Sequence, residues 1–132
     1  MSTEMYVYLG ISKFKEDPKL ITELVGVRPT KVQRTGDPIG NSKLKCKFNS
    51  WEYRIKATSK FELEPLVKVI LAKFRNKKNL AKAISHGEGA IVCVLHTSDT
   101  TPSIELSSET IANISELNCG FWLDFYPRAH ID

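Results

Sequence analysis

The sequence predicts an α+β fold in which an antiparallel or mixed sheet carries helices packed mainly on one face. Segments with alternating apolar residues occur near both ends of the chain, and amphipathic helical segments separate the strand-like ones. The expected order is β-α-β-β-α-(α)-β-β-α-β, which suits ferredoxin-like split β-α-β units. A length of 132 residues fits a single α+β domain spanning residues 1–132.

The first third of the chain contains the clearest boundary signals. Residues 5–11 alternate in hydrophobicity and predict a strand. Asp17 and Pro18 are typical of a helix N-cap and first turn, and Gly26 is typical of a left-handed helix end, so we expect a helix between them. A short strand near residues 31–34 and a polar loop over residues 35–43 should follow.

The apolar phase changes between residues 44 and 55. Even-numbered residues are apolar at first, and odd-numbered ones afterwards, the two sets being Leu44, Cys46, Phe48 and then Trp51, Tyr53, Ile55. A single strand cannot change phase without an extra residue. Either a β-bulge lies at Asn49-Ser50 or these two residues form a tight turn, and we favour the bulge.

The second half of the chain continues the alternation of helices and strands. Helical spacing of apolar residues predicts a helix from Leu63 to Phe74 and a shorter one near residues 80–84. Residues 90–95 are apolar throughout, which predicts a strand covered on both faces. We expect a short edge strand over Ser103–Leu106, a helix capped by Ser107, and a last strand over residues 121–126.

The charge distribution is uneven. Residues 43–82 contain twelve Lys or Arg and three Asp or Glu, whereas residues 83–132 contain one and seven. These regions could be two solvated faces, or they could steer a charged partner. Three cysteines at unrelated spacings and the lack of a signal-peptide-like or membrane-spanning apolar run lead us to expect a cytoplasmic protein without membrane contact.

Candidate catalytic residues are few. Cys93 and His96 are three residues apart on one strand, which points them to opposite faces and argues against a nucleophile–base pair. His86-Gly87-Glu88 has no further residues at ligand spacing nearby, so we predict no metal site and no cofactor. The sequence therefore argues against an enzyme; Asp37 and Asp124 would be the best catalytic carboxylates if it were one.

Several short motifs together resemble a known family. In order they are Tyr8-Leu9, Asp17-Pro18, Ile21-Thr22, Pro29-Thr30, Gly36-Asp37, Asn49-Ser50-Trp51 and Leu123-Asp124. This order is similar to that of a bacterial family of small proteins, domain of unknown function 4279. The resemblance implies a compact α+β domain in a bacterial cytosol. It implies no established activity, cofactor or catalytic residue.

Aromatic residues suggest where binding could occur. Tyr6, Tyr8, Trp122 and Tyr126 take the strand phase opposite the aliphatic residues. Either they form an exposed binding surface, or helices cover them as a second core layer. Trp51 could belong to either layer. The candidate binding residues are Tyr6, Tyr8, Asp37, Asn49, Trp51, Trp122, Asp124 and Tyr126.

The leading functional hypothesis is a non-enzymatic protein-interaction domain of an immunity-type or regulatory kind. Its partner would be another protein, and a homodimer is a further possibility. The alternative is a small-ligand or single-stranded nucleic-acid binding module that uses the aromatic sheet face and the basic stretch. Nucleic acid is the less favoured ligand because the sequence lacks the glycine- and aromatic-rich strand motif of RNA-recognition domains.

Overall fold

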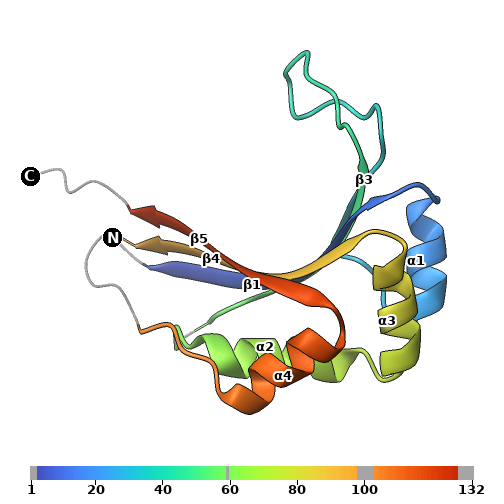
Figure 1. The fold of residues 1–132 in the computed structure, drawn as a ribbon. Helices are drawn as coiled ribbons and strands as arrows, with labels where there is room; N and C mark the ends of the chain where they lie inside the picture. The colour runs from blue at the N-terminus through green and yellow to red at the C-terminus, as the bar shows by residue number, and fades with distance from the viewer. Residues whose placement is uncertain (1–2, 59, 98–102, 128–132) are drawn as a thin grey trace, which may run out of the picture.

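The computed structural model describes residues 3–58, 60–97 and 103–127. These residues form a five-stranded mixed sheet and four helices, which confirms the α+β class (Figure 1). In chain order the elements are β1 (Glu4–Phe14), α1 (Pro18–Val25), β2 (Lys31–Gln33), β3 (Asn49–Lys56), α2 (Leu63–Lys73), α3 (Lys77–Ser85), β4 (Glu88–Thr97), α4 (Ser108–Glu116) and β5 (Cys119–Pro127).

The strand order explains the ferredoxin-like pattern. The sheet runs β2-β3-β1-β4-β5, and every neighbouring pair is antiparallel except β4 and β5. Consequently β1 and β2 run parallel with β3 between them, and β3 and β4 run parallel with β1 between them. These are two split β-α-β units. A further crossover through α4 adds β5 parallel to β4 at the edge of the sheet.

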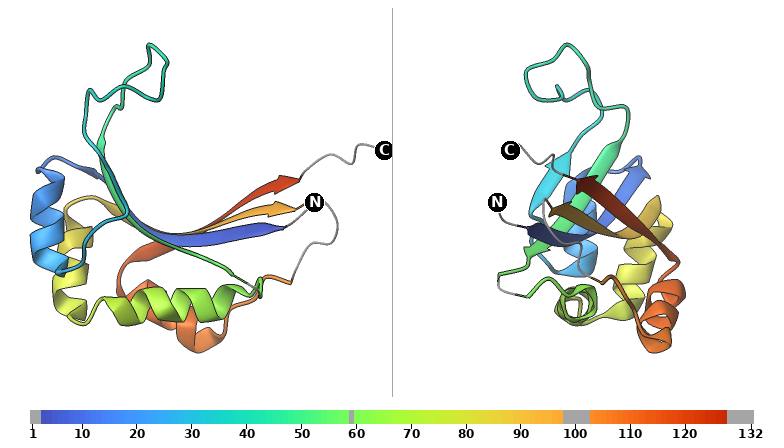
Figure 2. Two further views of the ribbon diagram at one scale, coloured as in Figure 1. Left: turned by 180° about the vertical axis from the view of Figure 1, so that it is seen from behind. Right: turned by 90° about the vertical axis from the view of Figure 1, so that its left-hand side faces the viewer.

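The described helices lie on one side of a strongly bent sheet, and the opposite face lies on the inside of the bend (Figure 2). The main core fills the space between sheet and helices. From β1 it takes Met5, Val7, Leu9 and Ile11, all fully buried. Alternation along this strand therefore sends one set of residues into the core and the other set, including Tyr6 and Tyr8, to the helix-free face.

Local signals fixed the helix ends as expected. The Asp17 carboxylate accepts a hydrogen bond from the Lys19 backbone N–H, and Gly26 ends α1 with a left-handed φ of 68°. Ser107 caps α4 by accepting from the backbone N–H of Thr110. After α4 the left-handed residue is Asn118, with φ 59°, so Gly120 is free to enter β5.

The predicted bulge at Asn49-Ser50 is wrong, and so is its alternative, a tight turn. Both residues begin β3, and the irregularity lies opposite them, between Ser12 and Phe14 of β1. Lys13 is the extra residue, with φ 64°. Gly87 approaches this bulge so closely that an added Cβ would lie 2.1 Å from the Ser12 carbonyl oxygen. The bulge on β1 therefore depends on a glycine from the turn before β4.

The change of apolar phase has a different cause. Residues 34–48 do not form a strand with β3; they project from the sheet as an arm (Figure 1). The arm is closed by a bridge between Pro38 and Lys45, and it exposes Ile39, Leu44 and Phe48. Leu44 and Phe48 therefore follow no sheet phase, although Cys46 is buried.

The predicted edge strand over Ser103–Leu106 is also wrong. These residues have no regular secondary structure and lead into the Ser107 cap. Ile104 and Leu106 pack against the core, which accounts for their apolar pattern without strand pairing. The edge position next to β4 belongs to β5 instead.

Candidate functional site

The helix-free face of the sheet, called the open face below, is the candidate site. Its central side chains come from four adjacent strands: Tyr6, Tyr8, Gly10, Glu52, Arg54, Lys56, Ala90, Val92, Val94, Gly120, Trp122, Asp124 and Tyr126. Ala90, Val92 and Val94 form a small second apolar cluster beneath the tyrosines. Strand β4 is thus buried on both faces as expected, but its second cover consists of aromatic side chains.

A row of small residues creates a hollow in this face. Gly10 pairs with Ala90, and Ala90 pairs with Gly120, so three neighbouring strands present nothing larger than a methyl group. The resulting cavity has a volume of about 450 Å³. That size lies within the range of about 300–1,000 Å³ typical of small-molecule sites.

Two aromatic rings border the small residues. An added Cβ at Gly10 would lie 3.1 Å from Cε1 of Tyr8, and one at Gly120 would lie 3.4 Å from Cζ3 of Trp122, so each ring leans over the glycine of its own strand. Tyr8 and Trp122 flank Val92 in register. Their Cα atoms are therefore about 10 Å apart, given about 4.8 Å between strands.

The charged groups around the hollow are mainly acidic. Glu52 is paired with Arg54, whose Nη2 lies 2.7 Å from the carboxylate, and Glu88 is paired with Lys13 at 3.3 Å. Asp124 lines the same hollow and has no ion-pair partner among the described residues. The hollow therefore retains one uncompensated negative charge, on Asp124, two residues after Trp122 on the same face of β5.

Arg54 and the tyrosines form a connected group. The Arg54 guanidinium lies 4.1 Å from the Tyr6 ring centre and 5.8 Å from that of Tyr8, in cation–π geometry. Burial raises the pKa of the Tyr8 hydroxyl, and the negative charges of Glu52 and Asp124 raise it further. Tyr8 therefore remains a neutral hydrogen-bond donor over the physiological pH range.

The remaining aromatic contact lies at the other end of the face. His96 stacks on Tyr126 with 4.8 Å between ring centres. Cys93 is in the core on the opposite side of the same strand, as its spacing from His96 predicted. Burial, with a smaller contribution from Asp124, raises the pKa of Cys93 to about 11, so the thiol stays protonated and is a poor nucleophile.

The structure brings together five of the eight candidate binding residues. Tyr6, Tyr8, Trp122, Asp124 and Tyr126 share the open face, as the alternating phase predicted. The other three lie elsewhere. The Asp37 carboxylate accepts a hydrogen bond from the Arg34 backbone N–H at 2.9 Å inside the arm, in a turn that contains Gly36 with φ 91°.

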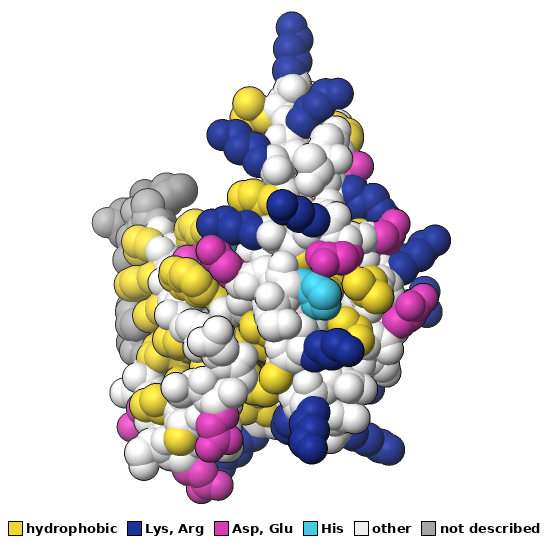
Figure 3. Space-filling model, turned by 45° about the vertical axis from the view of Figure 1, so that its right-hand side comes forward, with side chains coloured by type: hydrophobic (Ala, Val, Ile, Leu, Met, Phe, Trp, Pro, Cys, Tyr) yellow, Lys and Arg dark blue, Asp and Glu magenta, His cyan; other side chains and the backbone are white. Residues whose placement is uncertain are grey.

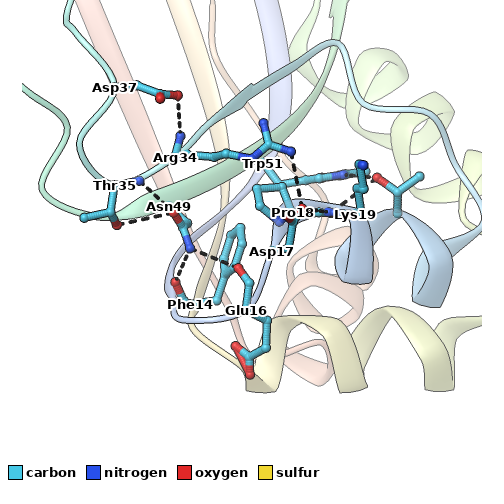
Figure 4. Close-up of polar contacts among 11 residues, drawn as sticks. Phe14, Glu16, Asp17, Pro18, Lys19, Arg34, Thr35, Asp37, Asn49 and Trp51 are labelled. Atoms are coloured by element: carbon cyan, nitrogen blue, oxygen red, sulfur yellow. Dashed lines mark hydrogen bonds and ion pairs between the residues drawn. The ribbon is translucent and has the colours of Figure 1, made fainter.

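Asn49 is a buried connecting residue at the base of the arm (Figure 4). Its Nδ2 donates to the carbonyl oxygens of Phe14 and Glu16, at 3.1 and 2.9 Å, and its Oδ1 accepts from the Thr35 backbone N–H at 2.7 Å. One amide thus joins the end of β1, the turn before α1 and the start of the arm.

Trp51 belongs to the core layer. Its side chain is 0% exposed, its ring is tilted against Phe74, and its Nε1 donates to the Thr22 hydroxyl at 3.0 Å. The backbone of Trp51, and not its ring, borders the hollow, because its carbonyl oxygen lies 4.0 Å from the position that an added Cβ at Gly10 would take. Trp51 pairs with the core residue Ile11 in the regular part of the ladder, and directly opposite residues of paired strands face the same side of the sheet, so the ring points toward the helices.

Sequence reasoning missed Glu52, Glu88 and Gln33, which also line the hollow. Glu52 could have been found, because it alternates with the buried Trp51 and the partly buried Tyr53 once the strand is known to start at Asn49. Glu88 and Gln33 had no local signal. They reach the hollow only because β4 and β2 lie on either side of the central pair of strands.

The hollow offers aromatic rings, a neutral hydroxyl and carboxylates, which suit binding by stacking and ion pairing. Basic side chains gather instead on the projecting arm (Figure 3). Within the described ranges, no three His, Cys, Asp or Glu side chains are grouped so that they could hold a metal ion. None of the described helices combines the length and apolar character needed to cross a membrane.

Comparison with known proteins identifies the family. A search of curated proteins and a search of solved structures each returned no match. The family model described as domain of unknown function (DUF4279) matches residues 3–128, which is nearly the whole chain. The resemblance noted from the short motifs is thereby confirmed. The chain belongs to the DUF4279 family.

Proposed function

We propose that this protein is a non-enzymatic protein-interaction domain that binds a segment of a partner protein in the hollow of the open face. One observation carries the proposal: the unpaired Asp124 carboxylate lines a cavity of about 450 Å³ together with Tyr8 and Trp122. Exposed aromatic residues around a pocket are typical of interface anchors. An immunity-type or regulatory role in a bacterial cytoplasm is the biological setting that we propose with it.

The chemistry of the hollow supports a cationic segment as its ligand. A lysine or arginine side chain entering between Tyr8 and Trp122 would lie against ring faces and reach the Asp124 carboxylate. Arg54 does not compete for this carboxylate, because Glu52 holds its guanidinium through two hydrogen bonds of 3.0 and 2.7 Å. A partner with an exposed basic loop or terminus would match this arrangement.

The alternative is a small-ligand or single-stranded nucleic-acid binding module. The cavity volume favours a small ligand, and the same charge argument makes a cationic one the better fit. Phosphates would be repelled by Asp124, whereas Lys43, Lys45 and Lys47 lie on the arm. We therefore expect weak, non-specific nucleic-acid binding that falls steeply with salt. Sub-micromolar, sequence-selective binding to single-stranded RNA or DNA at physiological salt would reverse this ranking.

Affinity capture from the source organism tests the leading proposal. Two variants alter the hollow: Ala90→Leu fills its floor, and Asp124→Asn removes its unpaired charge. Val69→Ala is the control, because Val69 is an exposed apolar residue on α2, away from the open face. A protein partner should be retained by the wild type and Val69→Ala and depleted at least tenfold by both hollow variants.

Calorimetry with the purified partner should show tight binding to the wild type and Val69→Ala and weaker binding to both hollow variants. A partner that binds both hollow variants as tightly as the wild type would refute binding in the hollow. A nucleic acid or a small cationic compound that co-purifies and is lost in both variants would favour the alternative function instead.

A further inference from the structure

Strand β5 is a long edge strand with apolar side chains exposed on both faces. Its nine residues pair with β4 on one side, and no described residue pairs with the other side. Phe121, Leu123 and Phe125 face the helix side and Trp122 and Tyr126 the open face, and all five are 39–53% exposed. Asp124 is the single charged residue within this strand.

Natural sheets protect their edges with short strands, lysines, bulges or covering elements, because an unpaired edge is a template for further pairing. Along Gly120–Tyr126 the single charged residue is Asp124, and among the described residues the free edge of β5 has no lysine, bulge or covering element. The exposed apolar surface also continues into a groove of about 350 Å³ between α4 and β5, lined by Leu106, Ile111, Ile114 and Phe121. Figure 3 shows hydrophobic side chains gathered on this side of the molecule.

We propose that a second copy of this chain pairs with β5 in antiparallel orientation, so that the two sheets join into one of ten strands. The two-fold axis would pass through Leu123, the middle residue of Cys119–Pro127, and the whole strand would take part. In this register Phe121 faces Phe125 of the second copy and Leu123 faces itself. Six apolar side chains then form one continuous cluster on the helix side.

The open-face side chains are compatible with the same register. Asp124 faces Trp122 of the second copy and not its own equivalent, so no like charges lie directly opposite each other. Gly120 faces Tyr126, whose ring would lie against the Trp122 ring that already leans over Gly120. Pro127, which lacks a backbone N–H, falls at the end of the ladder, opposite Cys119, where it interrupts no central pair.

The area involved suits a concentration-dependent dimer. With about 150–250 Å² per large side chain, the exposed fractions correspond to about 500 Å² of side-chain surface per copy. Pairing of nine backbone residues adds to this area. The total approaches the roughly 800 Å² per partner of a standard stable interface, so we expect dissociation in the micromolar range.

Charge complementation across the proposed register provides the test. Phe121→Lys and Phe125→Glu each place a charge against a phenylalanine in a self-pair, so each variant alone should be monomeric in sedimentation equilibrium at about 100 µM, a concentration above the expected micromolar Kd. Mixed together, the two variants restore one Phe–Phe pair and create one Lys–Glu pair, so the mixture should dimerise. Val69→Lys, which adds a charge on α2, should leave the wild-type dimer intact.

A cysteine pair checks the axis without depending on charged variants. In antiparallel strands, directly opposite Cα atoms are about 4.5–5.5 Å apart, which is compatible with a disulfide. Leu123→Cys should therefore form disulfide-linked dimers on oxidation above the wild-type level. Phe121→Cys should form few, because position 121 faces position 125.

Each failure has a distinct meaning. A wild-type protein that stays monomeric at about 100 µM would refute the dimer, since the expected micromolar dissociation would then be absent. So would a dimer that both Phe121→Lys and Phe125→Glu leave unchanged. Ligand binding in the hollow is tested separately by Ala90→Leu on β4, so it can fail or succeed whatever the oligomeric state.

Discussion

The sheet ends in β2 on one side and in β5 on the other, and these edge strands differ in length, charge and exposure. Strand β2 has three residues, begins with the exposed Lys31, and places Val32 beside the buried Trp51. Strand β3 continues past the residues that pair with β2, and this continuation contains the basic residues Arg54 and Lys56. Strand β5 has nine residues and one charge.

This difference separates stability from association. At the β2 edge, Trp51 and Asn49 are buried and hydrogen-bonded, so the interactions there hold the fold together. At the β5 edge, the large side chains remain about half-exposed, so their transfer from water is incomplete within one copy. Changes near β2 should therefore alter the free energy of unfolding, and changes on β5 should alter binding.

The largest effect should come from Trp51→Ala. The ring is fully buried against Phe74, and its indole N–H bonds Thr22, so truncation should lower the free energy of unfolding by about 3–5 kcal/mol. Urea denaturation measures this loss. A loss below about 1 kcal/mol would contradict the assignment of Trp51 to the core and weaken the contrast between the two edges.

The next effect should come from Asn49→Ala. Removing the amide leaves the carbonyls of Phe14 and Glu16 and the N–H of Thr35 without their partner, at a cost of about 2–3 kcal/mol. Because Asn49 anchors the base of the arm, limited proteolysis within residues 34–48 should also become faster. Ser50→Ala is the matched control, since Ser50 is the next residue of β3 and lies on the open face. Equal proteolysis of both variants would contradict the anchoring role.

Trp122→Ala should change binding more than folding. The indole is 53% exposed, so the free energy of unfolding should change by less than about 1 kcal/mol. Affinity for a partner in the hollow should fall by about 2 kcal/mol or more, because central aromatic anchors commonly carry most of an interface's energy. Titration of the partner and urea denaturation measure the two quantities. A stability loss equal to that of Trp51→Ala would show that the two tryptophans do not differ as proposed.

The smallest effect concerns the acid dependence of stability at the contact between α2 and the N-cap of α4, the helix that precedes β5. The Glu64 carboxylate accepts a hydrogen bond from the Ser107 backbone N–H at 2.5 Å, and hydrogen bonds from Ser107 and Thr110 lower the pKa of Glu64 from 4.5 to about 2. Because the folded-state pKa is depressed, this stabilising contribution is present above pH 4.5 and is lost as pH falls toward 2.

A comparison of the wild type with Glu64→Gln checks this effect. The wild type should have the higher melting temperature near neutral pH, and the difference should shrink between pH 4.5 and 2. A difference that stays constant across this range would mean that the Glu64 charge does not link α2 to the cap of α4. Since α4 leads into β5, loss of the link should not affect the β2 edge.

Much of the fold could be predicted from local signals. Asp17, Gly26 and Ser107 marked helix ends because capping depends on a few neighbouring residues. Alternating phase placed Tyr6, Tyr8, Trp122 and Tyr126 on one face, since a strand turns every second residue the same way. The family was recognisable from the same short motifs, and the match over residues 3–128 confirmed it.

The sequence by itself therefore determined the α+β class, the helices and the aromatic face, because these depend on periodicity and capping. Only the tertiary structure decided where the extra residue lies, that Asn49 joins three segments, and that Glu52, Glu88 and Gln33 meet at one hollow. Periodicity tells which face of a strand a residue occupies, but it says nothing about which strand lies next to it. Strand neighbours are set by pairing over long sequence separations, and so are the hollow and the open β5 edge.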